Sequence, residues 1–137
     1  MKVNEIMTRN VEFIQPNDSL QLAARKMRDR DIGFLPVYEG DELIGVVTDR
    51  DIAVRAIASD LNPDAILGRE LVTSPVVYCF EDQNVEDAAR LMGDNQIRRL
   101  VVLDRKNNQM VGVVSLGDLA RTVKEKTAEK TLENISS

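Results

Sequence analysis

The sequence contains no histidine and only one cysteine, Cys79. A single cysteine cannot form an internal disulfide, and without histidine a Cys/His zinc site cannot be built. Cys79 lies in the apolar run Val76 to Phe80, which is typical of a small core residue, and no histidine is present to activate it as a nucleophile. We therefore predict a core thiol, no catalytic cysteine and no metal site.

Aromatic residues and long apolar runs are also scarce. There is no tryptophan, and no apolar run approaches the roughly 20 residues needed to cross a bilayer. The first five residues lack the apolar core of a secretory signal, so we expect a soluble, cytoplasmic protein with no membrane partner. A net charge of -5 repels polyphosphate, which argues against extended nucleic-acid binding.

No catalytic constellation is present either. Acid–base and nucleophilic catalysis need paired side chains, and phosphoryl chemistry commonly needs a glycine-rich loop followed by lysine. The sequence supplies neither, and Asp49 beside Asp51 is not a metal cage. We predict that the protein is not an enzyme.

The chain repeats itself. The first matches share a spacing of 65 residues, and they include Ala23/Ala88, Arg25/Arg90, Met27/Met92, Ile32/Ile97 and Leu35/Leu100. After a polar turn the spacing becomes 67, where the matches are Gly45/Gly112, Val46/Val113, Val47/Val114 and Asp51/Asp118. Turns tolerate such insertions, so a duplication explains the pattern. The predicted domains are repeat 1 at residues 1–60, repeat 2 at 61–123 and a polar tail at 124–137.

Each repeat predicts the element order β-α-β-β-α. In repeat 1 we expect a short strand at 13–14, a helix after Asp18 or Ser19, strands at 34–38 and 43–47, and a helix from near Thr48. Repeat 2 predicts strands at 76–79, 100–103 and 110–114, with helices over 85–92 and from Ser115. A subdomain of about 60 residues buries only about 60% of its unfolded surface. We therefore expect the two repeats to pack through their sheets as one pseudo-twofold α/β (α+β) module.

The most specific motif occurs at the junction between the last strand and the last helix of each repeat. A hydroxyl residue precedes an aspartate by three positions, as Thr48 and Asp51 in one copy and Ser115 and Asp118 in the other. Local sequence alone favours a capping box, which needs no ligand. The same groups also suit a nucleotide, because a helix start and a hydroxyl donate to phosphate while a carboxylate accepts from ribose hydroxyls. The two roles are compatible.

With these motifs, the chain resembles a tandem pair of CBS domains, or Bateman module, over about residues 5 to 120. The motifs that carry the resemblance are Ile6-Met7-Thr8, Gly33-Phe34-Leu35-Pro36-Val37, Gly45-Val46-Val47-Thr48-Asp49-Arg50-Asp51-Ile52, Ile97-Arg98-Arg99-Leu100-Val101-Val102 and Gly112-Val113-Val114-Ser115-Leu116-Gly117-Asp118-Leu119. It is most similar to short stand-alone bacterial proteins that consist of one such pair. Repeat 2 departs from the family pattern with Val101 in place of Pro36 and Val72 in place of Met7.

The resemblance implies two clefts between the repeats that bind an adenosine-containing ligand such as AMP, ADP, ATP, NAD or S-adenosylmethionine. In the family pattern Asp51 and Asp118 match the ribose-binding acid, and Thr48 and Ser115 match the hydroxyl on the phosphate side. Arg98 or Arg99 could pair with phosphate, although a solvated surface role fits equally well. Arg50 and Arg55 rank below them. The candidates for the base pocket, all of which also suit the core, are Ile6, Met7, Val11, Ile14, Ile32 and Pro36.

The function predicted from the sequence is a regulatory module that senses an adenosine nucleotide, with that nucleotide as its only small-molecule partner and no other cofactor. The alternative is a ligand-independent module for protein interaction or dimerisation, in which the junction motifs are only helix caps. Pairs of this family usually associate as twofold dimers, so the resemblance also implies a homodimer.

Overall fold

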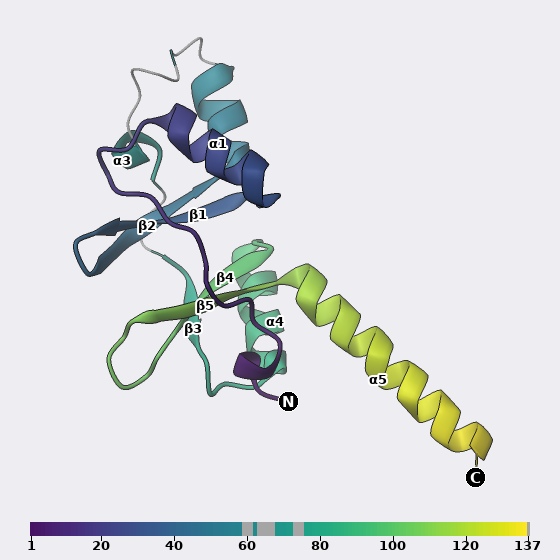
Figure 1. Ribbon diagram of the computed structural model, residues 1–137. Helices are drawn as coiled ribbons and strands as arrows, with labels where there is room; N and C mark the ends of the chain where they lie inside the picture. Colours follow the sequence, from purple (N-terminus) through teal and green to yellow (C-terminus); the bar gives the residue numbers. More distant parts are fainter. Residues whose placement is uncertain (59–61, 63–67, 73–75, 137) are drawn as a thin grey trace. The chain divides into compact units, whose positions relative to one another are not determined.

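The computed structural model describes residues 1–58, 62, 68–72 and 76–136, and it divides into two compact units (Figure 1). Unit 1 comprises Met1–Asn10 and Val77–Ser137, and unit 2 comprises Val11–Val76. Both combine strands with helices, so the predicted α/β class is confirmed. The boundary predicted between the repeats, between residues 60 and 61, lies outside the described residues.

Unit 2 is built on a β-hairpin. Its elements are α1 (Leu20–Arg30), β1 (Phe34–Glu39), β2 (Glu42–Thr48), α2 (Asp49–Asp51), the π-helix η2 (Ile52–Ile57) and α3 (Gly68–Leu71). Strands β1 and β2 are antiparallel. The short strand expected at 13–14 is reduced to a parallel bridge between Ile14 and Val37. The Ile14 N–H donates to the Pro36 carbonyl at 3.0 Å, which fixes this segment beside β1.

Unit 1 repeats this plan with a three-stranded sheet. Its elements are the 3-10 helix η1 (Val3–Glu5), β3 (Tyr78–Phe80), α4 (Val85–Asn95), β4 (Arg99–Leu103), β5 (Met110–Ser115) and α5 (Leu116–Ser136). The strand order is β3-β4-β5, with β3 parallel and β5 antiparallel to the central β4. The helices and strands therefore follow the order that the sequence predicts.

The duplication also extends to local backbone geometry. Helices α1 and α4 both end in a left-handed residue, Asp31 and Gln96, each with φ of 54°. The helix cap predicted at Asp18 or Ser19 is formed by Ser19, whose hydroxyl accepts from the Leu22 N–H at 3.1 Å. The hairpin ladders shift register at equivalent places, after Val37 in β1 and after Val102 in β4. Such agreement follows when two segments inherit the same turn and cap chemistry.

The compact units do not coincide with the sequence repeats, because each repeat contributes its leading segment to the other unit. The N-terminal segment belongs to unit 1: the Val3 N–H donates to the Gln83 carbonyl at 2.8 Å, and Thr8 and Val113 exchange two backbone hydrogen bonds of 2.8 and 3.0 Å. In return, the Gly68 N–H donates to the Asp18 carbonyl at 2.8 Å within unit 2. Local sequence patterns do not encode which sheet a segment joins.

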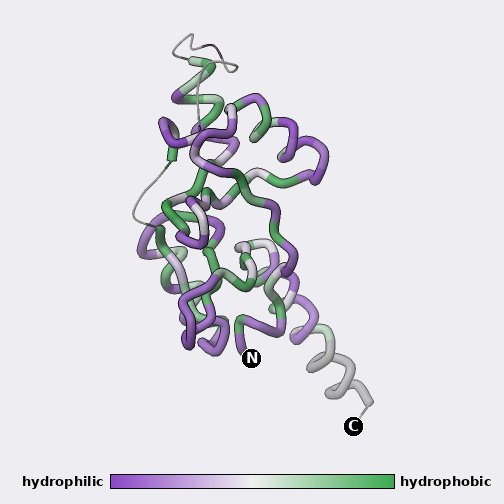
Figure 2. The backbone as a smooth tube through the Cα atoms, turned by 60° about the vertical axis from the view of Figure 1, so that its left-hand side comes forward, coloured by the Kyte–Doolittle hydropathy of each residue, from purple (hydrophilic) through white to green (hydrophobic). Residues whose placement is uncertain are grey.

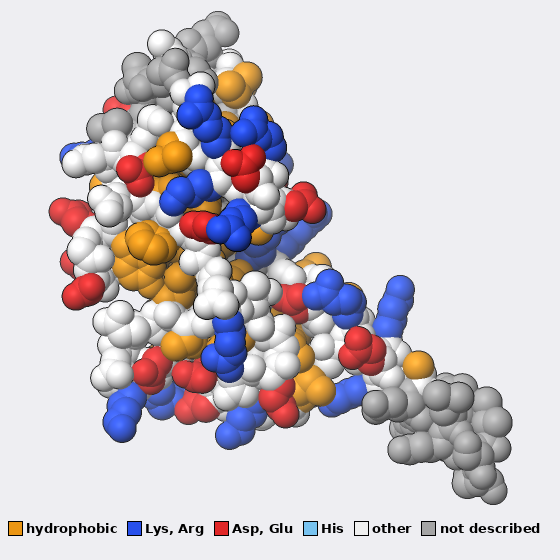
Figure 3. All heavy atoms as spheres, viewed as in Figure 1, with side chains coloured by type: hydrophobic (Ala, Val, Ile, Leu, Met, Phe, Trp, Pro, Cys, Tyr) orange, Lys and Arg blue, Asp and Glu red, His pale blue; other side chains and the backbone are white. Residues whose placement is uncertain are grey.

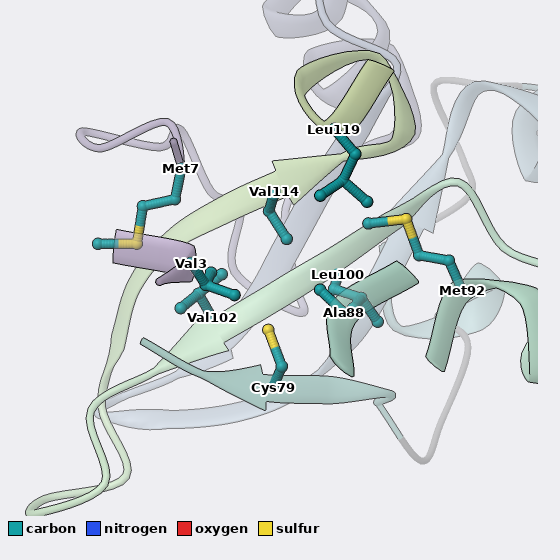
Figure 4. Packing of buried hydrophobic residues seen from close by; sticks show 9 residues of the cluster. All are labelled: Val3, Met7, Cys79, Ala88, Met92, Leu100, Val102, Val114 and Leu119. Atoms are coloured by element: carbon teal, nitrogen blue, oxygen red, sulfur yellow. The ribbon is translucent and has the colours of Figure 1, made fainter. Parts of the chain in front are cut away.

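Each unit has its own hydrophobic core. The buried residues of the unit 2 core are Ile14, Leu20, Ala23, Met27, Leu35, Val37, Val47 and Ala56. Those of the unit 1 core are Val3, Met7, Cys79, Ala88, Met92, Leu100, Val102, Val114 and Leu119 (Figure 4). Figure 4 shows Val3, from the N-terminal segment, lying beside Val102 of β4. The N-terminal segment thus completes the core formed by the second repeat.

The polar tail is helical. Helix α5 continues to Ser136, and residues 124–128 are exposed, in keeping with the hydrophilic colouring along much of its described length in Figure 2. Within the part of the chain that the structure describes, no helix is both long enough and apolar enough to cross a membrane.

Candidate functional site

The two junction motifs both form capping boxes where a strand meets a helix. At the end of β2, the Thr48 N–H donates to Asp51 Oδ2 at 2.9 Å and the Asp51 N–H donates to Thr48 Oγ1 at 3.1 Å. At the end of β5, the Ser115 N–H donates to Asp118 Oδ2 at 2.9 Å and the Asp118 N–H donates to Ser115 Oγ at 3.1 Å. The predicted caps are confirmed, and they hold both aspartates in equivalent, fixed positions.

The two carboxylates differ in the hydrogen bonding of their second oxygen, Oδ1. Asp118 is nearly buried, and its Oδ1 accepts from Nη2 of Arg121 one helical turn further along α5. Asp51 is half-buried, and among the described residues its Oδ1 has no hydrogen-bond partner. Position 54, which matches Arg121 in the repeat, is Val54. A ligand that binds Asp51 Oδ1 therefore breaks no hydrogen bond to a described side chain, whereas at Asp118 it has to compete with a guanidinium.

The backbone N–H groups at the two helix starts also differ in the hydrogen bonds that they donate. The first N–H of each helix donates to the residue that precedes the hairpin, Asp49 to the Gly33 carbonyl at 2.9 Å and Leu116 to the Arg98 carbonyl at 2.7 Å. The second N–H of α2, from Arg50, donates to Asp49 Oδ1 at 2.8 Å. The residue that matches Asp49 is Leu116, which has no carboxylate, and among the described residues the corresponding Gly117 N–H makes no hydrogen bond to a side chain.

The predicted arginines belong to the junction in unit 1. Arg98 is exposed and comes immediately before β4, and Arg99 begins β4 as the register partner of Ser115. The structure therefore brings the backbone of Arg98 and Arg99 beside Ser115 and Asp118. Sequence reasoning missed Arg121, although its position three residues after Asp118 on a helix was a usable signal.

The predicted base-pocket residues are divided between the two units. Ile6 and Met7 contribute to the unit 1 core, and Val11, Ile14, Ile32 and Pro36 lie in unit 2. Ile14 and Pro36 are fully buried and Met7 is nearly so, whereas Ile6, Val11 and Ile32 are half-buried. Of the predicted residues, Ile6, Val11 and Ile32 are therefore partly open to solvent, and the base pocket stays a prediction.

Charged side chains also lie outside the two junctions. Among the described residues, no group of three or more cysteine, aspartate or glutamate side chains is arranged to hold a metal ion. On the face drawn in Figure 3, Lys and Arg side chains are interspersed with Asp and Glu side chains. Away from the junctions, Arg105 pairs with Asp82 through Nη2 at 2.9 Å and lies 4.2 Å from the centre of the Phe80 ring, which secures the β4–β5 turn.

Cys79 is expected to be unreactive in the folded protein. It is 1% exposed, and burial, assisted by the negative charge of Asp87, raises its pKa to about 11. Because the thiolate is the reactive form, a thiol reagent at neutral pH should modify the protein only after urea unfolding. Stoichiometric modification of the folded chain, at a rate similar to that of the unfolded chain, would show that the thiol is accessible.

Comparisons with known proteins agree on one family. A family model described as the CBS domain matches residues 3–57 and 68–125. CBS domain-containing protein YhcV of Bacillus subtilis is 38% identical over 135 residues, which cover 98% of this chain and 94% of that protein. The chain is also similar to the solved structure of the CBS domain pair of protein MJ0100 in complex with 5′-methylthioadenosine and S-adenosyl-L-methionine. That likeness has a TM-score of 0.82 with 27% identity, and covers 92% of this chain and 98% of the other. The solved structure of CBSX2 in complex with AMP has a TM-score of 0.76 with 25% identity, over 92% and 98% of the two chains.

Proposed function

Because the chain belongs to the CBS-domain family, as a tandem pair of such domains, we propose that it is a regulatory module that binds an adenosine-containing ligand at Asp51 and Asp118. The observation that carries the proposal is the pair of strand-end carboxylates, each held in place by a hydroxyl residue three positions earlier. A carboxylate only accepts hydrogen bonds, which suits the neighbouring hydroxyl groups of a ribose. The caps hold the acid in position before the ligand arrives, so binding orders little of the protein.

The ligands of the similar structures support adenosine as the shared chemistry. AMP, 5′-methylthioadenosine and S-adenosyl-L-methionine, which are named for CBSX2 and MJ0100, all contain adenine and ribose but differ at the 5′ position. Recognition of the ribose alone does not distinguish these three compounds, so the groups around each carboxylate have to select among them. A ligand regulates such a module only if it binds two arrangements of the protein with unequal affinity.

We propose further that the module is a homodimer. In both units, the helical segment that follows the junction exposes a large apolar side chain, Ile57 in η2 and Val123 in α5. Twofold closure is the commonest way to cover such surfaces in a homo-oligomer. Light scattering on a size-exclusion column should give twice the mass of the chain at micromolar concentration. A monomer mass under these conditions would contradict the dimer.

Thermal unfolding in the presence of ligands tests the proposed binding. AMP, ATP, NAD, S-adenosylmethionine and a guanine nucleotide are compared on the parent, Asp51→Ala and Asp118→Ala. A ligand at a hundredfold excess over its dissociation constant should stabilise the folded state by about 2.7 kcal/mol, and each substitution should reduce the shift caused by the ligand that its site binds. Each variant is compared with itself with and without ligand, because losing a cap alone costs about 0.5–2 kcal/mol.

Asp87→Ala is the matched control. Asp87 completes a capping box at the start of α4, where the Asn84 N–H donates to its Oδ2 at 3.3 Å, but it lies away from both strand-to-helix junctions. Its loss should lower the unfolding temperature while the ligand-dependent shift stays as in the parent. If no adenosine compound stabilises the parent, the ligand-independent interaction module becomes the better account.

A further inference from the structure

The two proposed sites match in sequence position but differ in the groups around the carboxylate. Resting on the proposed function, we propose that the Asp118 site takes a phosphate-bearing adenosine ligand and the Asp51 site takes an adenosine derivative without phosphate. Three differences between matching positions carry this inference.

The first difference is Arg121. Its guanidinium, whose side chain is 72% exposed, is held against Asp118, whereas the matching position beside Asp51 is the apolar Val54. A ribose that binds Asp118 competes for the oxygen that Arg121 now occupies. An anionic ligand offers the displaced guanidinium a new partner, because arginine binds phosphate oxygens with two parallel hydrogen bonds. A ligand without phosphate offers the displaced guanidinium no new partner, so the interaction energy lost with the ion pair is not recovered.

The second difference lies at the residues before the hairpin. Arg98 and Arg99 stand in unit 1 where Gly33 and Phe34 stand in unit 2. The equivalence holds in three dimensions, since the Arg98 and Gly33 carbonyls accept from the first N–H of α5 and of α2, respectively. Residues 48–55 contain two acidic and two basic side chains, and residues 115–122 contain one of each. The two additional arginines therefore give only the Asp118 site a positive balance.

The third difference is Asp49. Its carboxylate accepts the Arg50 N–H at 2.8 Å and adds a second negative charge close to Asp51. A phosphate at this place would be repelled by Asp49 and would have to replace it as acceptor. The matching residue in unit 1 is Leu116, which has no carboxylate to repel a phosphate or to accept the Gly117 N–H. All three differences favour an anion at Asp118 and disfavour one at Asp51.

Calorimetric titration of the full chain with AMP and with 5′-methylthioadenosine tests the assignment, because the two compounds share adenosine and differ in the phosphate. Arg121→Val and Val54→Arg exchange the residues of the two sites, and both side chains are more than half exposed, so both variants should still fold. Arg121→Val should weaken AMP binding at least about tenfold while leaving 5′-methylthioadenosine binding at least as tight, since a hydrogen bond to a charged group is lost. Val54→Arg should weaken 5′-methylthioadenosine binding.

Lys126→Val is the control for general electrostatics. It removes the same charge from the exposed part of α5 more than a turn beyond Arg121, so AMP affinity should stay close to that of the parent. Asp118→Ala should abolish AMP binding and spare 5′-methylthioadenosine, and Asp51→Ala should do the reverse. The assignment would be overturned, with the proposed function intact, if each aspartate variant lost affinity for both ligands equally. It would also be overturned if Arg121→Val bound AMP with unchanged affinity. A parent chain that binds neither compound would instead remove the proposed function.

Discussion

Replacing Leu100 by alanine is expected to lower the free energy of unfolding by about 2–5 kcal/mol, the usual cost of deleting a fully buried leucine side chain. Leu100 is 0% exposed and lies on β4, the central strand of the unit 1 sheet, where it packs in the same cluster as Ala88 and Met92. The cavity would be enclosed by residues from both a helix and the sheet. Urea unfolding at fixed protein concentration measures the loss.

Leu116→Ala supplies the matched control, because it deletes the same atoms at an exposed position of α5. Its effect should stay within about 0.5 kcal/mol, as is usual for surface substitutions. Two equal losses would mean that Leu116 is buried as well, and a loss at Leu100 no larger than the surface value would contradict the unit 1 core.

Replacing Gly112 by alanine is expected to lower the free energy of unfolding by about 1–3 kcal/mol, the range for an overpacked site. The added Cβ would lie 2.6 Å from the Thr8 carbonyl oxygen and 2.9 Å from Met7 Sδ. The Thr8 oxygen is backbone and accepts from the Val113 N–H at 3.0 Å, so it cannot move without breaking that pairing. Amide hydrogen exchange should accordingly become faster at residues 3–8 than elsewhere in unit 1.

Gly93→Ala is the control, with an effect of opposite sign. A Cβ at Gly93 meets no atom within 4 Å, and the residue lies in helix α4. Alanine there should stabilise the protein by about 0.5–1 kcal/mol, because glycine is the poorer helix former. If Gly112→Ala did not lower the free energy of unfolding, the N-terminal segment would not pair with β5 as described.

The order of the elements could be predicted from the sequence because each element is marked by local signals. Apolar periodicity marks α1 and α4, and a hydroxyl residue three positions before an aspartate marks the starts of α2 and α5. The exchange of leading segments could not be predicted in this way. Thr8 pairs with Val113 across more than a hundred residues, and nothing in the local pattern around Thr8 distinguishes one sheet from the other.

The candidate site shows the same division. The spacing of Asp51, Asp118 and their hydroxyl partners predicts the helix caps that the structure contains, and the ligand clamp that the same spacing suits stays a prediction. The sequence could not separate pocket residues from core residues, because an apolar residue such as Ile14 suits both. The complete burial of Ile14 is known only from its packing in the structure. The difference between the two sites depends on Arg121 and Val54, whose positions match in the sequence repeat, but the ion pair between Arg121 and Asp118 is a side-chain contact that only the structure shows.

A crystal structure of the chain grown with AMP tests the central claim most directly. The account predicts that the ribose hydroxyls donate to the Asp118 carboxylate at about 2.5–3.0 Å, with the phosphate near Arg121. A ribose bound away from both Asp118 and Asp51, with both capping boxes unchanged, would contradict it.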